Sequence, residues 1–161
     1  MKYTIFAAAA MALLVAGCDT VPGGNSGLAP AGAGDPSNPD SVAYFQQTVG
    51  DRVLFQVDQS TLTTVAMATL DQQAAWLLQR PEINVLIEGH ADEQGTREYN
   101  LALGSRRAAA VRDYLVSKGL TDGRVRTITY GKERPLEVCS TEDCWAKNRR
   151  AVTVVEGGVG S

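Results

Sequence analysis

Apolar residues recur along the second half of the chain with two different periods, and these periods predict its secondary structure. Ile83, Val85 and Ile87 fall on one face of an extended segment, as in a half-buried strand. Between residues 101 and 115 the apolar positions return every three or four residues, which is the spacing of a helix packed on a sheet. The pattern predicts strands at 52–57, 83–88, 125–130 and 151–155, and helices at about 62–79 and 97–118.

Capping and turn residues separate these elements. The turn Asp58–Thr61 offers side chains that can cap the first helix, and Arg80-Pro81 ends that helix. Lys118-Gly119 supplies a C-cap for the second helix, and Gly104 and Ala108 would let that helix approach the sheet closely. The order β-α-β-α-β-β predicts an α+β fold, a two-layer sandwich with both helices packed on one side of the sheet.

The N-terminus has the features of a secretory signal. Lys2 precedes an apolar run at residues 5–16, which is too short to cross about 30 Å of hydrocarbon comfortably. Small residues before Cys18 resemble a bacterial lipoprotein cleavage site, which would make Cys18 the lipidated N-terminus. An ordinary signal peptide is the alternative. Asp19 leaves open which membrane retains the anchor, because Asp at this position is associated with inner-membrane retention in enteric bacteria.

The next segment has the composition of a flexible tether. Residues 19–40 contain five glycines, four prolines and no aromatic residue, so they cannot bury enough apolar surface to offset their ordering entropy. Residues 41–50 are transitional, with apolar side chains available to pack on the domain. The predicted organisation is a signal peptide at 1–17, a lipidated N-terminus and tether at 18–50, a folded domain at 51–156 and a disordered tail at 157–161.

The net charge and the few histidine and cysteine residues argue against several functional classes. The net charge of −3 argues against a general nucleic-acid binder, because phosphate contacts need a basic surface. His90 is the single histidine, so a multi-histidine metal site is excluded. Cys139 and Cys144 lie close together in a polar segment, where an oxidising compartment favours a disulfide. A metal pair is the alternative, but their spacing is poor for zinc.

The charged stretch 88–108 is the candidate site. Asp92 follows the second strand and Arg107 lies three turns into the next helix, so that helix must run back beside the loop if the two are to meet. A structural ion pair is one interpretation. The other is a receptor for a zwitterion, in which Asp92 accepts from an ammonium, Arg107 clamps a carboxylate and Asn100 adds hydrogen bonds. Helix N-terminal amides would favour the anionic end.

The runs GHADEQGTREYNLALGSRRAAAVRDYL, YGKERP and AKNRRAV resemble the OmpA-like peptidoglycan-binding domain family over roughly residues 51–156. The resemblance implies a mixed sheet with helices on one side. It also implies that Asp92 and Arg107 hold the free amino-acid end of diaminopimelate in the peptidoglycan stem peptide. Asn100 matches the family's YN position, and Asp58 and Asn148 match polar positions on loops that border the same face.

Lipoprotein members of this family share the layout of anchor, tether and domain. The resemblance therefore implies an outer-membrane lipoprotein that faces the periplasm, binds peptidoglycan non-covalently, and works with the Tol proteins, including the β-propeller protein TolB, in division and envelope integrity. It implies no cofactor, and the family usually lacks Cys139 and Cys144. A peptidoglycan anchor of another envelope complex and a wall-acting enzyme are the alternatives.

The charged stretch favours binding over catalysis. It contains no serine or cysteine nucleophile with a placed base, and no zinc-protease spacing. His90 is accordingly predicted to be a packed residue at the end of a strand. The sequence predicts a protein that is not an enzyme.

Overall fold

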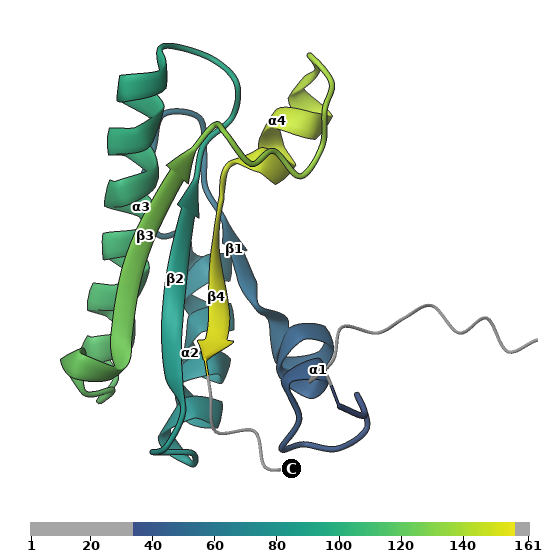
Figure 1. Ribbon diagram of the computed structural model, residues 1–161, viewed down its shortest axis with the longest axis vertical. Helices are drawn as coiled ribbons and strands as arrows, with labels where there is room; N and C mark the ends of the chain where they lie inside the picture. Colours follow the sequence, from purple (N-terminus) through teal and green to yellow (C-terminus); the bar gives the residue numbers. More distant parts are fainter. Residues whose placement is uncertain (1–33, 157–161) are drawn as a thin grey trace, which may run out of the picture.

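The computed structural model describes residues 34–156, so the signal sequence, Cys18 and the tail at 157–161 lie outside the described residues. Four strands form one mixed sheet in the order β1-β4-β2-β3 (Figure 1). β4 runs antiparallel to both β1 and β2, whereas β2 and β3 are parallel. The predicted α+β fold is confirmed. The strands are β1 (Arg52–Leu54), β2 (Asn84–His90), β3 (Val125–Gly131) and β4 (Arg150–Glu156).

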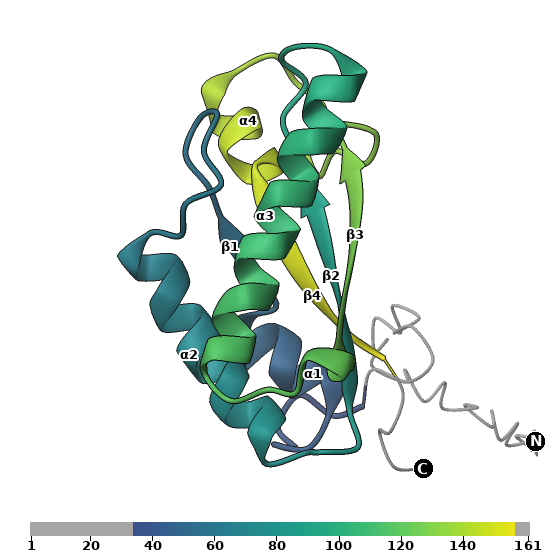
Figure 2. The ribbon, with the colours of Figure 1, turned by 90° about the vertical axis from the view of Figure 1, so that its left-hand side faces the viewer.

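Two helices, α2 (Thr64–Leu78) and α3 (Arg97–Ser117), cover one face of this sheet (Figure 2). α3 starts where the pattern predicts it, and Thr96 caps it, because the Thr96 side chain accepts from the amide of Tyr99 at 3.2 Å. The cap of α2 is Thr63 rather than a residue of the 58–61 turn. The core between helices and sheet includes Leu70, Leu77, Val85, Ile87, Val111 and Leu115.

Two glycines set the closeness of α3 to the sheet. A Cβ atom added to Gly104 would lie 2.4 Å from Thr129 Oγ1 and 2.8 Å from the carbonyl oxygen of Gly89. A Cβ atom added to Gly89 would lie 1.9 Å from the carbonyl oxygen of Gly104. The predicted close approach at Gly104 is therefore real, and it depends on a missing side chain on both elements.

The first predicted strand is too long. β1 ends at Leu54 instead of residue 57, although the amide of Phe55 still donates to Arg149 at 2.9 Å. The chain then leaves the sheet, because a guanidinium group from α3 bonds the carbonyl of Gln56 and because Asp58 adopts a φ of 55°.

The folded domain also starts earlier than residue 51. A short helix α1 (Val42–Tyr44) and a π-helical turn η1 (Phe45–Gly50) pack against α2, with Phe45 fully buried. The Trp76 ring packs against Phe45 in a tilted arrangement, with ring centroids 4.9 Å apart. The indole N–H of Trp76 donates to the carbonyl of Pro39 at 2.8 Å. The boundary of the tether predicted at residue 50 therefore moves back at least to Pro39.

The segment before β4 contains a helix, although the apolar pattern of the sequence predicts none between residues 130 and 151. A two-turn helix, α4 (Glu142–Asn148), contains Cys144 and leads directly into β4. A 3-10 turn, η2 (Asp122–Arg124), precedes β3. Between residues 34 and 156, no helix combines the length and apolar character needed for a membrane crossing.

Candidate functional site

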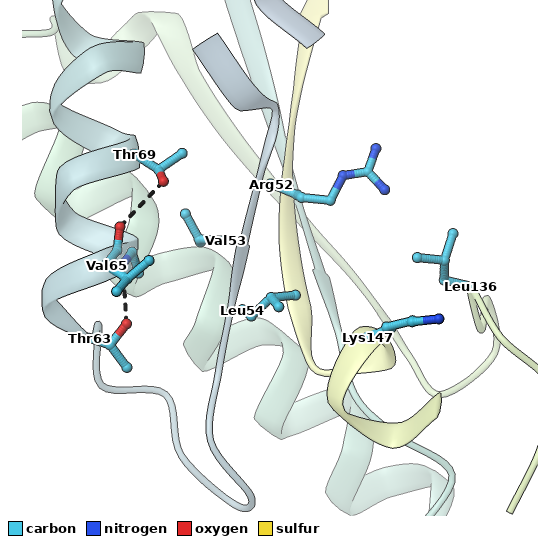
Figure 3. A pocket seen from close by; sticks show the side chains of 9 residues that line it. Arg52, Val53, Leu54, Thr63, Val65, Thr69, Leu136 and Lys147 are labelled. Atoms are coloured by element: carbon cyan, nitrogen blue, oxygen red, sulfur yellow. Dashed lines mark hydrogen bonds between the residues drawn. The ribbon is translucent and has the colours of Figure 1, made fainter. Parts of the chain in front are cut away.

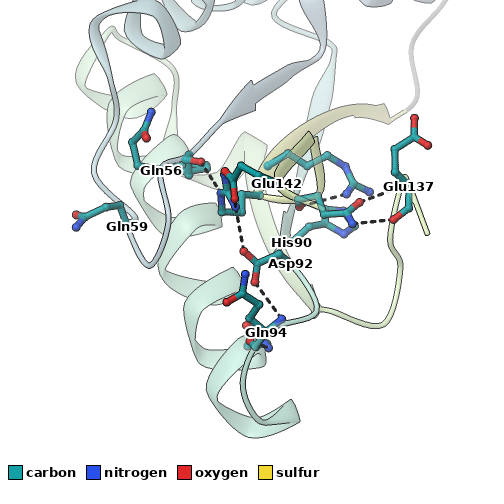
Figure 4. Close-up of polar contacts among 12 residues, drawn as sticks. Gln56, Gln59, His90, Asp92, Gln94, Glu137 and Glu142 are labelled. Carbon is teal, nitrogen blue, oxygen red and sulfur yellow. Dashed lines mark hydrogen bonds and ion pairs between the residues drawn. The ribbon is translucent and has the colours of Figure 1, made fainter. Parts of the chain in front are cut away.

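The candidate site lies where β2 ends and α3 begins. A pocket of about 290 Å³ opens there. Three of the predicted site residues line it: Asp92 from the loop after β2, Asn100 from the first turns of α3, and Asp58 from the loop after β1. Figure 4 draws the polar contacts around this end of the sheet. The other lining residues are Val57, Gln94, Gly95, Tyr99 and Leu103.

The carboxylate of Asp92 is held from two sides. One oxygen accepts from the amide of Gln94 at 3.2 Å, and the other accepts from Nη1 of Arg149 at 3.2 Å. Only 7% of Asp92 is exposed. A carboxylate oxygen has more than one acceptor position, so both oxygens keep capacity for a further donor in the pocket.

Asn100 presents a buried acceptor without a partner. Its amide nitrogen donates to the carbonyl of Gln94 at 2.7 Å, which fixes the orientation of the side-chain amide. Its Oδ1 atom is buried and has no hydrogen bond to any residue in the described part of the chain. A buried acceptor left unpaired costs about 1–3 kcal/mol, so this oxygen favours a ligand that donates a hydrogen bond.

Arg107 is completely buried, and its guanidinium bonds the backbone. Nε donates to the carbonyl of Gln59 at 2.8 Å, Nη1 to that of His90 at 2.8 Å and Nη2 to that of Gln56 at 3.1 Å. Burial lowers the pKa of Arg107 to about 10, and Asp92 opposes that shift, so the group stays charged at neutral pH. Arg107 therefore ties the loop after β1 to the end of β2, and unlike Asp92 and Asn100 it does not line the pocket.

Arg149 is a site residue that the sequence reasoning missed. Besides Asp92, its guanidinium contacts the carboxylate of Glu142 through both terminal nitrogens, and Nε donates to the carbonyl of Phe55 at 3.3 Å. Burial disfavours the charged form, but the bonds to Glu142 and Asp92 outweigh it and raise the pKa of Arg149. The only signal in the sequence was its place as the first arginine of the NRR run.

Asp58 and Asn148 have different surroundings. Asp58 is exposed at the pocket and accepts from the hydroxyl of Tyr99. Asn148 is buried, and its Oδ1 accepts from the amides of Leu136 and Glu137 at 2.7 and 3.0 Å. Its nitrogen donates back to the carbonyl of Glu137 at 2.8 Å. The side chain of Asn148 thus holds the segment before α4, whereas Asp58 faces the pocket.

His90 lies at the end of β2 with only 1% of its surface exposed. Its ring packs beside Tyr130 with centroids 5.5 Å apart. Burial, followed by the charges of Arg150 and Arg134, lowers the pKa of His90 to about 4, so the ring is neutral at pH 7. Across residues 34–156, no group of three or more His, Cys, Asp or Glu side chains is arranged to hold a metal ion.

A disulfide joins Cys139 to Cys144, whose Cα atoms are 5.9 Å apart. It closes a short ring that contains Ser140 and Glu142. The hydroxyl of Ser140 donates to the carboxylate of Glu93 at 2.9 Å, so this ring contacts the loop that carries Asp92.

A second groove of about 360 Å³ runs along β1, and its character is different. Its lining is mainly apolar and hydroxyl-bearing, with Val53 and Leu54 from the strand and Val65 from α2 (Figure 3). No carboxylate lines it, and none of the predicted site residues does. The charged residues of this groove are the cations Arg52 and Lys147, whereas the pocket at the end of β2 is lined by the carboxylates of Asp58 and Asp92.

Known proteins are similar to this chain in sequence and in fold. The OmpA family model matches residues 54–149. The chain is 52% identical over 160 residues to the peptidoglycan-associated lipoprotein of Rhizobium meliloti, covering 98% of this chain and 89% of that protein. It is 41% identical over 164 residues to the protein of the same name from Pseudomonas aeruginosa, covering 93% of this chain and 95% of that protein. The chain therefore belongs to the OmpA family and, within it, to the peptidoglycan-associated lipoproteins.

Solved structures agree with this placement. The crystal structure of the peptidoglycan-associated lipoprotein from Burkholderia pseudomallei superposes with a TM-score of 0.67 at 38% identity, covering 76% of this chain and 100% of that chain. The C-terminal domain of MotB from Helicobacter pylori superposes with a TM-score of 0.63 at 17% identity, covering 67% of this chain and 85% of that chain. At that identity, the second comparison speaks only for the fold.

Proposed function

We propose that this protein binds peptidoglycan non-covalently through the free amino-acid end of diaminopimelate in the stem peptide. The observation that carries the proposal is the pair of acceptors in one pocket, the carboxylate of Asp92 and the unpartnered Oδ1 of Asn100. An ammonium group donates up to three hydrogen bonds and carries positive charge, so it matches this pair. The names of the relatives support the same ligand class.

Arg107 is assigned to the carboxylate end of the zwitterion. Each of its terminal nitrogens carries two N–H groups. In the part of the chain that the structure describes, each nitrogen makes one hydrogen bond, so each has a second N–H to donate. Its positive charge lies within the electrostatic reach of Asp92, because that carboxylate opposes the lowering of the pKa of Arg107 by burial. Amides in the first turn of α3 add a favourable field for an anionic group. No step in this proposal makes or breaks a covalent bond.

The anchor and partners complete the proposal. Lipidated Cys18 would hold the protein in the outer membrane, with the domain in the periplasm, and the segment after it would span the distance to the cell wall. The protein would work with the Tol proteins at division and for envelope integrity, with TolB competing with peptidoglycan for the domain. Support comes from the lipoprotein-like N-terminus and from relatives that are named as lipoproteins.

Replacing the carboxylate of Asp92 tests the site. Asp92→Asn keeps the shape and removes the charge, so we expect co-sedimentation with purified sacculi to fall by about tenfold or more, because a charge-assisted bond is lost. Arg107→Ala is a weaker test, since it also releases three backbone carbonyls.

Asp113→Asn is the matched control, because it removes one exposed carboxylate from the same domain outside the pocket. Thermal unfolding of each variant establishes that the fold is retained. If folded Asp92→Asn protein co-sediments as well as the parent, the assigned site is wrong.

A further inference from the structure

One guanidinium in the site contacts two carboxylates. Nη1 of Arg149 lies 3.2 Å from Oδ2 of Asp92 and 3.5 Å from Oε2 of Glu142, and Nη2 donates to the other oxygen of Glu142. Arg149 and Asp92 are buried, whereas the side chain of Glu142 is 61% exposed on the first turn of α4. The buried pair is therefore capped from the solvent side by a second acid.

This geometry contributes to the negative charge at the pocket, beside the charges of Asp58 and Arg107. Arg149 alone would neutralise Asp92, and a neutral pair attracts an ammonium only weakly. With Glu142 on the same guanidinium, the three groups together carry a charge of −1. The bidentate contact to Glu142 also competes for the donors of Arg149 and leaves Asp92 with a single contact from it.

We propose that Glu142 is a positioning residue for ammonium recognition: by engaging Arg149 it leaves the carboxylate of Asp92 charged and available to the ligand. This inference rests on the proposed function, and it adds a determinant that lies outside the pocket lining. Glu142 acts through Arg149 and needs no contact with the ligand.

The disulfide holds Glu142 in place. Cys139 and Cys144 flank Glu142 in sequence, and their bond closes a ring of six residues around it. The same ring is fixed to the loop after β2 by the bond from Ser140 to Glu93. Without the covalent closure, the exposed side chain of Glu142 would lose more freedom on pairing, and its contact with Arg149 would weaken.

Binding of a soluble stem peptide that contains diaminopimelate, measured by calorimetry with the full-length protein in detergent, tests the role of Glu142. We expect Glu142→Gln to weaken binding about threefold to tenfold, the range for removing one nearby charge at a partly exposed position. Glu142→Asp keeps the charge and should restore most of the affinity. Asp143→Asn is the matched control, because it removes a neighbouring carboxylate of the same helix turn and should leave affinity unchanged.

A modified ligand separates this role from general support of the fold. If the N-terminus of the peptide is blocked in both ligands and the side-chain amino group of diaminopimelate is acetylated in one, that ligand has no ammonium, and Glu142→Gln should then make no difference to its remaining affinity. An equal loss for both ligands would overturn the proposal, as would a folded Glu142→Gln protein that binds the unmodified peptide like the parent.

The contribution of the disulfide is tested by a double-mutant cycle. Replacing both Cys139 and Cys144 with Ser should reproduce the loss seen for Glu142→Gln, and adding Glu142→Gln to that variant should cause little further loss. Additive losses would show that the disulfide does not act through Glu142. If the parent itself fails to bind the peptide, the proposed function is what fails, whereas parent binding with an inert Glu142 defeats only this inference.

Discussion

Two buried guanidinium groups lie near Asp92, and they differ in what they bind. Arg107 donates to three backbone carbonyls, so its main structural effect is to fix the loop after β1 against the end of β2. Arg149 pairs with carboxylates, so it controls the charge of the pocket. The two arginines thus have different roles, because α3 and the junction between α4 and β4 bring them to different partners.

The buried histidine makes stability depend on pH. His90 has a folded pKa of about 4 against an unfolded value of 6.5, so the unfolded chain binds more protons between these values. Above about pH 6.5 the contribution of His90 to the free energy of unfolding should be constant. We expect that free energy to fall by about 3 kcal/mol as the pH drops toward 4, because the unfolded chain then takes up the proton. Urea unfolding at pH 7.5, 5.5 and 4.5 measures this change.

A His90→Phe variant is the control, since it keeps an aromatic ring beside Tyr130 without a titrating group. Its stability should decline less over the same interval. Equal declines in the two proteins would show that other groups cause the pH dependence.

At the scale of elements, the contact of α3 with β2 and β3 positions the site. This contact places Asn100 beside the loop of Asp92, and it is close because neither Gly89 nor Gly104 has a side chain. Leu115 and Val111 continue the same packed face toward the other end of α3. The position of the site therefore depends on packing along the whole helix.

Gly104→Ala should destabilise the domain. Alanine is about 1 kcal/mol better than glycine in a helix, but its Cβ would lie within 2.8 Å of the carbonyl oxygen of Gly89, so overpacking dominates. We expect a net loss of about 2 kcal/mol in urea unfolding, with weaker binding to sacculi because Asn100 shifts. Ser105→Ala, at an exposed position of the same helix, should change stability by less than about 0.5 kcal/mol.

At the scale of the whole molecule, the N-terminal segment joins the domain at the end of the sheet away from the site (Figure 1). α1 and η1 cover Trp76. The indole of Trp76 donates to the carbonyl of Pro39, and the guanidinium of Arg80 donates to the carboxylate of Asp40. Under the proposed function, a chain that arrives from a membrane anchor would enter the domain opposite the pocket, which would leave the pocket free to face the cell wall.

Phe45→Ala tests whether this segment is part of the folded unit. Phe45 is fully buried against Trp76, so its truncation should cost roughly 3 to 5 kcal/mol and shift the tryptophan fluorescence of the native protein. Gln46→Ala, an exposed neighbour, should have little effect on either measurement. A Phe45→Ala protein as stable as the parent would return the domain boundary to residue 51.

The sequence by itself determined the α+β fold class, the start of α3 near residue 97, the close approach at Gly104 and the placing of Asp92 and Asn100 near one another. These features depend on local periodicity, on capping chemistry and on motifs that lie within one short stretch. The family resemblance added the ligand class, which the residues alone left open against a structural ion pair.

Only the tertiary structure decided which groups meet across long separations. Arg149 reaches Asp92 from 57 residues away, and Arg107 reaches Gln56 from 51 residues away. Helix α4 escaped prediction because its seven residues carry too little apolar periodicity. The sequence leaves residues 41–50 able to pack on the domain, but only the structure brings Phe45 against Trp76 of α2. Such contacts follow from the packing of distant segments, which a local pattern does not encode.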